Sequence, residues 1–149
     1  MTRTKFPGAL RPLLGLLVIG IVSLGCASAD TRTAEMGASC DQFGAEKTIT
    51  QSTDVSVGDK VKVTLCTNAS TGFTWGEPEI SDSAIVSFID TSASAPATGA
   101  TQVVGAAGLE VVTLEALAKG TSVVVLQYGQ PWAGGTSGEW TYNLTVTVR

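Results

Sequence analysis

The sequence predicts an all-β fold, an antiparallel β-sandwich of about seven short strands. Three observations support this fold class. Runs of alternating polar and apolar residues recur along the chain, segments rich in Gly, Ser, Asp and Pro separate them, and no helical period follows the first 25 residues. Short strands with turns at such spacing are typical of two packed antiparallel sheets.

The first 25 residues have the features of a secretory signal peptide. Three basic residues precede an apolar run at residues 13–22 that is too short for a stable transmembrane helix. The run leads into Ser23-Leu24-Gly25-Cys26, which resembles a bacterial lipobox, so we expect a lipid on Cys26 and anchoring to the cell membrane or envelope. Ala27-Ser28-Ala29 provides the alternative, ordinary secretion of a soluble chain that begins at Asp30.

The expected organisation is a signal peptide (1–25), a flexible tether (26–40) and one β domain (41–149), acting as a monomer. The chain carries nine basic and thirteen acidic residues, and three of the basic ones lie in the leader, so the mature chain has six against thirteen and a net charge of −7. This acidic balance argues against nucleic acid as a partner, because phosphates require a basic face. Contact with a membrane is expected through the N-terminal lipid alone.

Cysteine and histidine usage limits the chemistry. With Cys26 lipidated or removed, Cys40 and Cys66 remain as an even pair in an exported domain, which predicts a disulfide closing a loop of 27 residues. Two separate buried thiols are the alternative. The chain has no histidine, which excludes Ser-His and Cys-His catalysis and histidine-containing zinc sites. We expect no catalytic residues, no metal and no cofactor.

The strands are predicted in order. The first covers residues 47–51, the second 60–67, where the alternation is clean, and the third 73–76. Residues 77–83 contain Pro and Ser and break the chain before a fourth, nearly continuous apolar strand at 84–89. Glu77 and Glu79 flank Pro78, and we interpret them as solvated surface residues rather than a catalytic pair.

The second half of the chain continues the pattern. Residues 92–101 contain only Ser, Ala, Pro, Thr and Gly and predict a loop, followed by strands at 109–118 and 121–128. A glycine-rich loop at 129–139 leads to the seventh strand, 140–148. In this strand Tyr142, Leu144, Val146 and Val148 should face inward.

Three loops are expected to lie at one end of the sandwich, because successive strands run up and down. Loop 1 is residues 68–73, loop 2 residues 105–108 and loop 3 residues 129–139. Loop 1 is interpreted as a compact hairpin turn in which Gly72 takes a positive φ and Asn68 forms an Asx turn.

The three loops together resemble the chagasin-type inhibitors of papain-like cysteine peptidases. Loop 1 resembles the family pattern Asn-Pro-Thr-Thr-Gly-Phe/Tyr, loop 2 approaches Gly-x-Gly-Gly, and loop 3 follows a strand ending in Tyr128 and resembles Arg-Pro-Trp/Phe. The resemblance covers residues 41–149. The residues that carry it are Asn68, Ala69, Ser70, Thr71, Gly72 and Phe73 in loop 1, Gly105, Ala106, Ala107 and Gly108 in loop 2, and Gln130, Pro131 and Trp132 in loop 3.

The resemblance implies an immunoglobulin-like sandwich and a reversible inhibitor that plugs the peptidase cleft with these loops. It implies that Ser70 and Thr71 lie nearest the catalytic cysteine and that Trp132 stacks on an aromatic wall of the peptidase. Three residues depart from the family pattern. Ala69 replaces a proline that would restrict the free loop, Ala107 replaces a glycine, and Gln130 replaces an arginine.

Two classes of function stay open. The first is a proteinaceous inhibitor of papain-like cysteine peptidases, and the alternative is a surface-anchored interaction or adhesion module with an immunoglobulin-like fold and no peptidase target. Binding of the three-loop end to a papain-like cleft distinguishes them. Trp132 is the residue whose position decides most, because a loop tryptophan either folds back onto its own sandwich or stays available to a partner.

Overall fold

The computed structural model of the chain describes residues 31–94 and 107–149. The predicted signal peptide, the lipidation site Cys26 and most of the predicted loop at 92–101 lie outside the described residues. Within the described ranges, no helix is long and apolar enough to cross a membrane.

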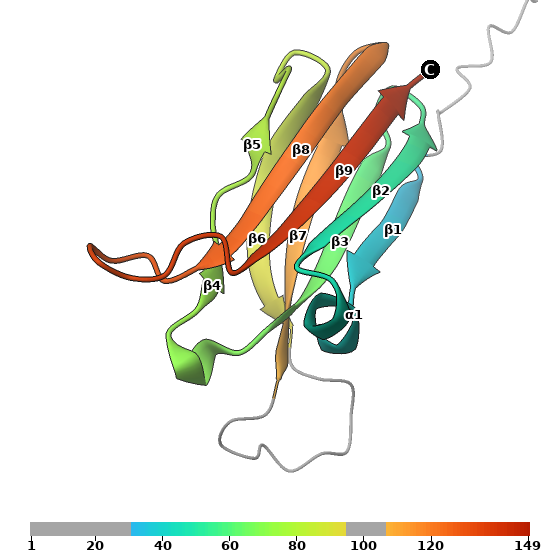
Figure 1. Cartoon of the computed structure of the whole chain (residues 1–149). Helices are drawn as coiled ribbons and strands as arrows, with labels where there is room; N and C mark the ends of the chain where they lie inside the picture. The colour runs from blue at the N-terminus through green and yellow to red at the C-terminus, as the bar shows by residue number, and fades with distance from the viewer. Residues whose placement is uncertain (1–30, 95–106) are drawn as a thin grey trace, which may run out of the picture.

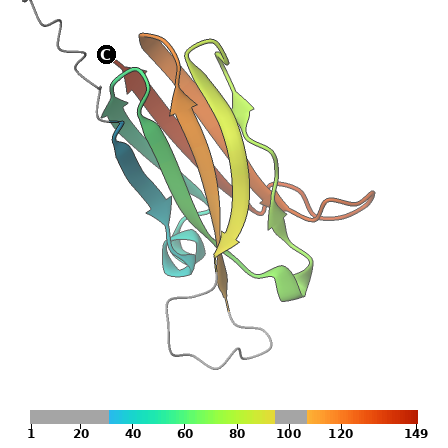
Figure 2. The same ribbon diagram turned by 180° about the vertical axis from the view of Figure 1, so that it is seen from behind.

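Two facing sheets build the domain. The first sheet has the order β1-β3-β7-β6, and the second has the order β2-β9-β8-β4 with β5 also paired to β8. Figure 1 shows β2, β9 and β8 in front, and Figure 2 shows the other sheet from behind. The bounds in the first sheet are Thr33–Ala38 (β1), Lys60–Thr67 (β3), Gly108–Ala116 (β7) and Val86–Ser94 (β6). In the second sheet they are Thr48–Val55 (β2), Trp140–Val148 (β9), Gly120–Gly129 (β8), Thr74–Trp75 (β4) and Glu79–Ile80 (β5).

Alternation of side chains places the core between the sheets. Tyr142, Leu144, Val146 and Val148 of β9 are all buried, as their spacing predicts. They meet the buried side chains of the opposite sheet, among them Val61, Val63, Leu65, Val112 and Leu114. The predicted strands at 60–67 and 140–148 coincide with β3 and β9. The other predicted strands are present with bounds that differ by one to five residues at an end.

The sheets are mixed rather than purely antiparallel, which corrects the predicted topology. β1 runs parallel to β3 and β2 runs parallel to β9, whereas the β3–β7, β6–β7 and β8–β9 pairs are antiparallel. The N-terminal segment and β2 each add a strand at a sheet edge, so both parallel partners are strands distant in the sequence. Turn signals between successive strands carry no information about such pairings.

The segment predicted as a tether contains a strand. β1 pairs with β3 from Thr33 opposite Lys60 to Ala38 opposite Leu65, so the domain begins before residue 41 and the tether prediction is wrong for this part. The short apolar residues of β1 have low strand propensity, so periodicity did not reveal it. Gly37 shows how close the two strands lie. A β-carbon at this position would stand 2.1 Å from the carbonyl oxygen of Thr64.

A short helix, α1 (Cys40–Ala45), follows β1 at the lower end of the sandwich in Figure 1. Ser39 and Gln42 form a capping box, in which each side chain bonds to the backbone N–H of the other residue. The helix buries Phe43 completely. The sequence analysis predicts no helix here, although the Ser-x-x-Gln pattern is a capping signal in the sequence itself.

A second unpredicted element lies in the segment expected to break the chain. β5 (Glu79–Ile80) pairs with Val125 and Val124 of β8, and Ile80 packs against the core. Two residues are too few for an alternation to be recognised in the sequence. Glu77 and Glu79 are exposed, which agrees with their interpretation as solvated surface.

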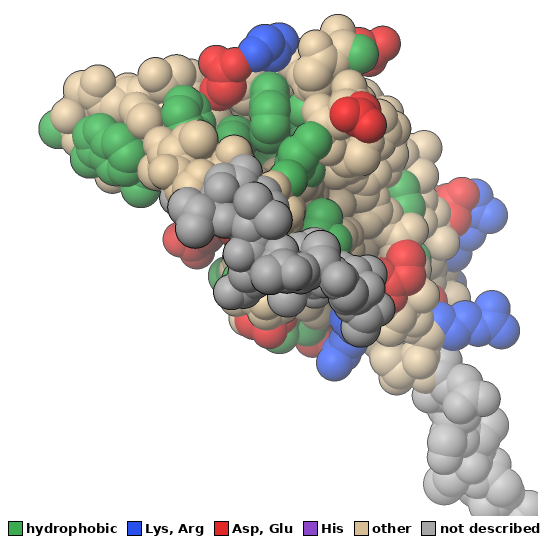
Figure 3. All heavy atoms as spheres, turned by 90° about the horizontal axis from the view of Figure 1, so that it is seen from below, with side chains coloured by type: hydrophobic (Ala, Val, Ile, Leu, Met, Phe, Trp, Pro, Cys, Tyr) green, Lys and Arg blue, Asp and Glu red, His purple; other side chains and the backbone are tan. Residues whose placement is uncertain are grey.

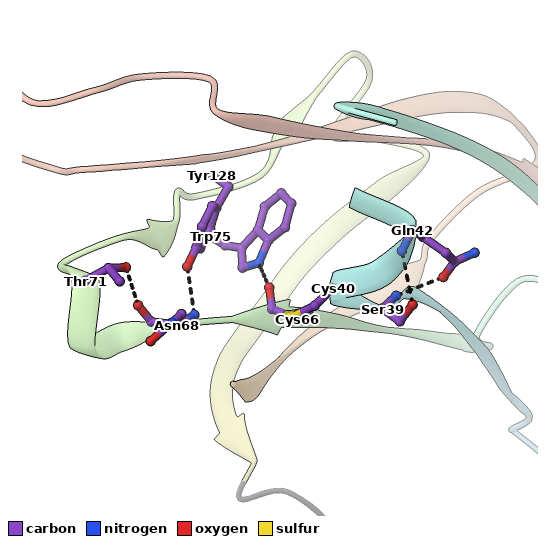
Figure 4. Close-up of a disulfide and its surroundings, with 8 residues drawn as sticks. All are labelled: Ser39, Cys40, Gln42, Cys66, Asn68, Thr71, Trp75 and Tyr128. Carbon is purple, nitrogen blue, oxygen red and sulfur yellow. Dashed lines mark hydrogen bonds between the residues drawn. A yellow bond between two sulfur atoms is a disulfide. The ribbon is translucent and has the colours of Figure 1, made fainter. Parts of the chain in front are cut away.

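The predicted disulfide is present. Cys40 at the start of α1 is bonded to Cys66 in β3, with the two Cα atoms 5.2 Å apart (Figure 4). The bond fixes α1 to the last turn of chain before loop 1. The Cys66 carbonyl also accepts a hydrogen bond from the indole N–H of Trp75 at 2.9 Å, so the disulfide joins a buried polar contact between the sheets.

Candidate functional site

Loops 1 and 3 lie at the same end of the sandwich, together with the start of β7. The β3–β7 register places Thr67 opposite Gly108, and the β6–β7 register places Ser94 opposite Leu109. The end of β8 lies beside them, because the backbone N–H of Asn68 donates a hydrogen bond to the hydroxyl of Tyr128. Figure 1 shows this end at the bottom and lower left of the molecule.

Loop 1 crosses from one sheet to the other. It leaves β3 in the first sheet and enters β4, which pairs with β8 in the second sheet. The predicted hairpin is therefore wrong. The strands flanking loop 1 alternate as hairpin strands do, but their bonding partners lie in different sheets, and a sequence pattern does not specify the partner.

Hydrogen bonds close loop 1 into a compact turn. Residues Ala69–Thr71 form a 3₁₀ turn in which the carbonyl of Asn68 accepts from the backbone N–H of Thr71 at 3.1 Å and from its hydroxyl at 2.6 Å. The Asn68 side-chain oxygen accepts from the Ser70 hydroxyl at 2.6 Å, so Asn68 bonds a side chain rather than the backbone N–H of an Asx turn. Gly72 has φ +76°, as predicted.

Loop 3 packs on loop 1 through Trp132. A β-carbon on Gly72 would lie 2.4 Å from the edge of the Trp132 indole, so only glycine permits this approach. Trp132 nevertheless remains 51% exposed. It therefore neither folds back into the sandwich core nor extends freely, but covers loop 1 with one side of its ring and leaves the rest open. Pro131 beside it is exposed.

Gln130 closes loop 3 and approaches loop 1. Its backbone N–H donates to the carbonyl of Thr136 at 2.7 Å, and its side-chain oxygen accepts from the backbone N–H of Thr136 at 3.1 Å. The side-chain amide donates to the Thr71 carbonyl at 3.5 Å. The residue that replaces the family's arginine thus serves contacts within the protein.

Only part of loop 2 is described. Gly105 and Ala106 lie outside the described residues, Ala107 is exposed, and Gly108 is the first residue of β7, beside Thr67. The structure therefore places the end of loop 2 next to the start of loop 1. It makes no contact between loop 2 and Trp132 within the described ranges.

An aromatic cluster supports loops 1 and 3 from below. Tyr128 stacks on Phe73 and on Trp140, with ring centroids 5.4 and 4.7 Å apart, and Phe43 of α1 stacks on Trp140 at 5.1 Å. Trp75 is buried and contacts both Phe43 and Tyr128. The sequence analysis places Trp75 and Trp140 in strands as core or sheet-surface residues, which the structure confirms, but it does not find the cluster.

The loop tips carry no charge, and acidic side chains surround them. Residues 68–73 and 130–138 contain no Lys, Arg, Asp or Glu. Glu139 pairs with Lys47 beside loop 3, and burial raises the pKa of Glu110, although hydrogen bonds from Trp75 and Thr74 oppose the shift. Figure 3 looks onto this end, where exposed apolar side chains lie among red carboxylates. An open hollow of about 280 Å³ lies between loop 1 and the start of β9.

The site is built for contact rather than for chemistry. Its exposed polar groups at the tip are the hydroxyls of Ser70 and Thr71, and the chain has no histidine that could act as their base. Within residues 31–94 and 107–149, no group of three or more acidic or cysteine side chains is placed to hold a metal ion. The geometry is that of a rigid, largely uncharged ridge beside an apolar hollow.

A rigid sandwich that presents such a ridge, without catalytic groups, defines a class of binding or inhibitory proteins. Residues 54–146 match the family described as Chagasin family peptidase inhibitor I42. The chain therefore belongs to the chagasin family of peptidase inhibitors, as the three loop motifs predict, and is an inhibitor rather than an enzyme.

Solved structures agree on the fold. The cysteine protease inhibitor EhICP2 from Entamoeba histolytica is 22% identical, with a TM-score of 0.60 over 80% of this chain and 98% of that one. Amebosin is also 22% identical, with a TM-score of 0.48 over 77% and 98%. PbICP-C, solved in complex with falcipain-2, is 19% identical, with a TM-score of 0.45 over 79% and 99%. No curated protein matches the sequence significantly.

Proposed function

We propose that the protein inhibits papain-like cysteine peptidases reversibly by inserting loops 1 and 3, with loop 2 beside them, into the active-site cleft. The observation that carries the proposal is the Trp132 ring packed over Gly72, which joins two loops of the family's motif into one ridge before any partner binds. A ridge that is already ordered loses less conformational entropy on binding. The structural neighbour EhICP2 is itself a cysteine protease inhibitor.

The turn in loop 1 explains how a peptidase could be covered without cleaving the inhibitor. The 3₁₀ turn and the positive φ of Gly72 keep the backbone of loop 1 from the extended form that a substrate presents to a catalytic cysteine. Attack requires the reacting atoms to be aligned within about 3–3.5 Å, and a tight turn does not offer that alignment. Ser70 and Thr71 at the tip would then fill the cleft beside the cysteine.

The structure also offers a reason why two departures from the family pattern are tolerated. Proline at position 69 would order the free loop, and here the three hydrogen bonds to Asn68 supply order instead. Arginine at position 130 would offer a charged contact, whereas Gln130 bonds within loop 3 and to Thr71. We therefore propose that recognition rests on shape and apolar area.

Steady-state inhibition of papain tests this proposal. The peptidase is first activated with a thiol, the thiol is removed to protect the disulfide of the inhibitor, and the oxidised protein is then titrated in. We expect reversible loss of activity, with a trypsin-like serine peptidase unaffected because its cleft has a different shape. If every papain-like peptidase tested stays fully active at micromolar inhibitor, the sandwich is an interaction module instead.

We further propose that the protein is exported and anchored by a lipid on Cys26, with ordinary secretion from Asp30 as the alternative. β1 begins at the end of the sandwich opposite loops 1 and 3, since Thr33 pairs with Lys60 at the far end of β3. A chain tethered through its N-terminus would therefore present the loops away from the membrane. Intact mass of the membrane fraction should show diacylglycerol on Cys26, and a soluble chain beginning at Asp30 would refute the anchor.

A further inference from the structure

Tyr128 is the last large side chain of β8 before loop 3, and it bonds to the first residue of loop 1. Its hydroxyl accepts a hydrogen bond from the backbone N–H of Asn68 at 2.7 Å, as Figure 4 shows. Tyr128 belongs to the second sheet, whereas Asn68 directly follows β3 of the first sheet. The bond therefore joins the two sheets at the point where loop 1 begins.

The ring of Tyr128 has little freedom to move. It is 3% exposed and lies against Phe73, Trp75 and Trp140, with centroid distances of 5.4, 5.0 and 4.7 Å. Stacked aromatic neighbours on several sides fix both the plane of the ring and the position of its hydroxyl. The acceptor that Asn68 meets is therefore held by packing and not by the loop itself.

The same side chain contacts both ends of loop 1. The hydroxyl holds Asn68 at the beginning of the loop, and the ring face stacks on Phe73 at its end. The backbone of Tyr128 continues through Gly129 into loop 3, where Gln130 approaches Thr71 and Trp132 covers Gly72. Every described contact between loops 1 and 3 thus starts from the end of β8.

A buried tyrosine can also serve stability alone, and the protein contains such a case for comparison. Tyr142 of β9 is fully buried, and its hydroxyl donates to the side-chain oxygen of Gln51 at 2.6 Å. Its position opposite Leu126 in β8 is two residue pairs further from loop 3 than Tyr128 opposite Trp140. Both hydroxyls make one buried hydrogen bond, but only that of Tyr128 meets a loop.

We propose that Tyr128 is a positioning residue for inhibition, whose hydroxyl sets the place and angle at which loop 1 leaves the sandwich relative to loop 3. Its effect on inhibition rests on the proposed function, while its effect on the loop does not. Without the hydroxyl, the Asn68 amide loses its acceptor and the loop must be ordered when the peptidase binds, which weakens binding.

The test compares Tyr128→Phe with Tyr142→Phe in the full exported protein. Each substitution removes one buried hydroxyl and keeps the ring. We expect Tyr128→Phe to raise the inhibition constant against papain about fivefold, the loss of roughly one ordinary hydrogen bond, while Tyr142→Phe leaves it unchanged. An unchanged constant for Tyr128→Phe, or an equal rise for both variants, would overturn the proposal.

Amide hydrogen exchange provides a readout that needs no peptidase. In Tyr128→Phe the Asn68 amide should exchange faster by about tenfold or more, and in Tyr142→Phe it should exchange as in the unaltered protein. Unchanged exchange at Asn68 would refute the positioning role directly. If exchange responds as expected but the unaltered protein inhibits no papain-like peptidase, the positioning role stands and the proposed function fails.

Discussion

Trp132→Ala is expected to raise the inhibition constant against papain about 30-fold, equivalent to about 2 kcal/mol of binding free energy. Trp132 is 51% exposed at the tip of the ridge, so a large apolar area is available to a partner. An indole also has few rotatable bonds to immobilise. Interfaces of about 800 Å² per partner commonly take most of their free energy from a few such residues.

Two further variants separate the contact from its effect on the loops. Trp132→Phe keeps a ring against Gly72 and should lose less affinity than Trp132→Ala. Leu117→Ala is the matched control, because Leu117 is also exposed, by 44%, but follows β7 at the other end of the sandwich. Equal inhibition by the unaltered protein and Trp132→Ala would show that this side chain is no anchor.

Removing the disulfide by the double change Cys40→Ala and Cys66→Ala is expected to lower the free energy of unfolding by about 3–4 kcal/mol. The bond closes a long loop, with the two cysteines separated by 26 positions, and so restricts the unfolded chain. In the folded protein it holds α1 in place, and α1 supplies the buried Phe43 that stacks on Trp140. The change should therefore also loosen the support of loop 1.

Urea unfolding measures this effect, with a midpoint expected to fall by roughly 2 M. The internal control is reduction of the unaltered protein with a thiol, which should produce a similar shift and should leave the double variant unaffected. Coincident midpoints for the oxidised protein and the double variant would show that the bond contributes no stability.

Much of the fold could be predicted because two long strands report their environment directly. In β9 the buried residues Tyr142 to Val148 alternate with more exposed ones, and β3 alternates in the same way, so one face of each strand had to be buried. Their predicted bounds agree with the structure for this reason. The cysteine pair was also predictable, since an exported chain rarely keeps two free thiols.

The elements that escaped prediction are held by contacts distant in the sequence. β1 has a weak pattern and exists because it pairs with β3, and α1 is only six residues long and depends on Phe43 being buried between Trp75 and Trp140. Short helices and strands gain their stability from packing rather than from intrinsic propensity. The sheet that each strand joins is likewise absent from any local pattern.

The candidate site was predictable as a set of loops but not as a surface. The motifs named Gly72 and Trp132 separately, whereas the contact between them depends on the path of loop 1 across the two sheets. Tyr128 was noted only as the residue that ends a strand. Its hydrogen bond to Asn68 joins residues 60 positions apart, and spacing alone cannot indicate such a pair.

The central claim, that the ridge of loops 1 and 3 occupies the peptidase cleft, is tested most directly by alkylation of the catalytic cysteine. Papain is mixed with increasing amounts of the oxidised protein and treated briefly with iodoacetamide, and the labelled fraction is measured by mass. The account predicts that labelling slows in proportion to inhibition and is nearly abolished at saturation, with Trp132→Ala protecting only at correspondingly higher concentration. Inhibition with undiminished labelling would place the contact outside the cleft and contradict the account.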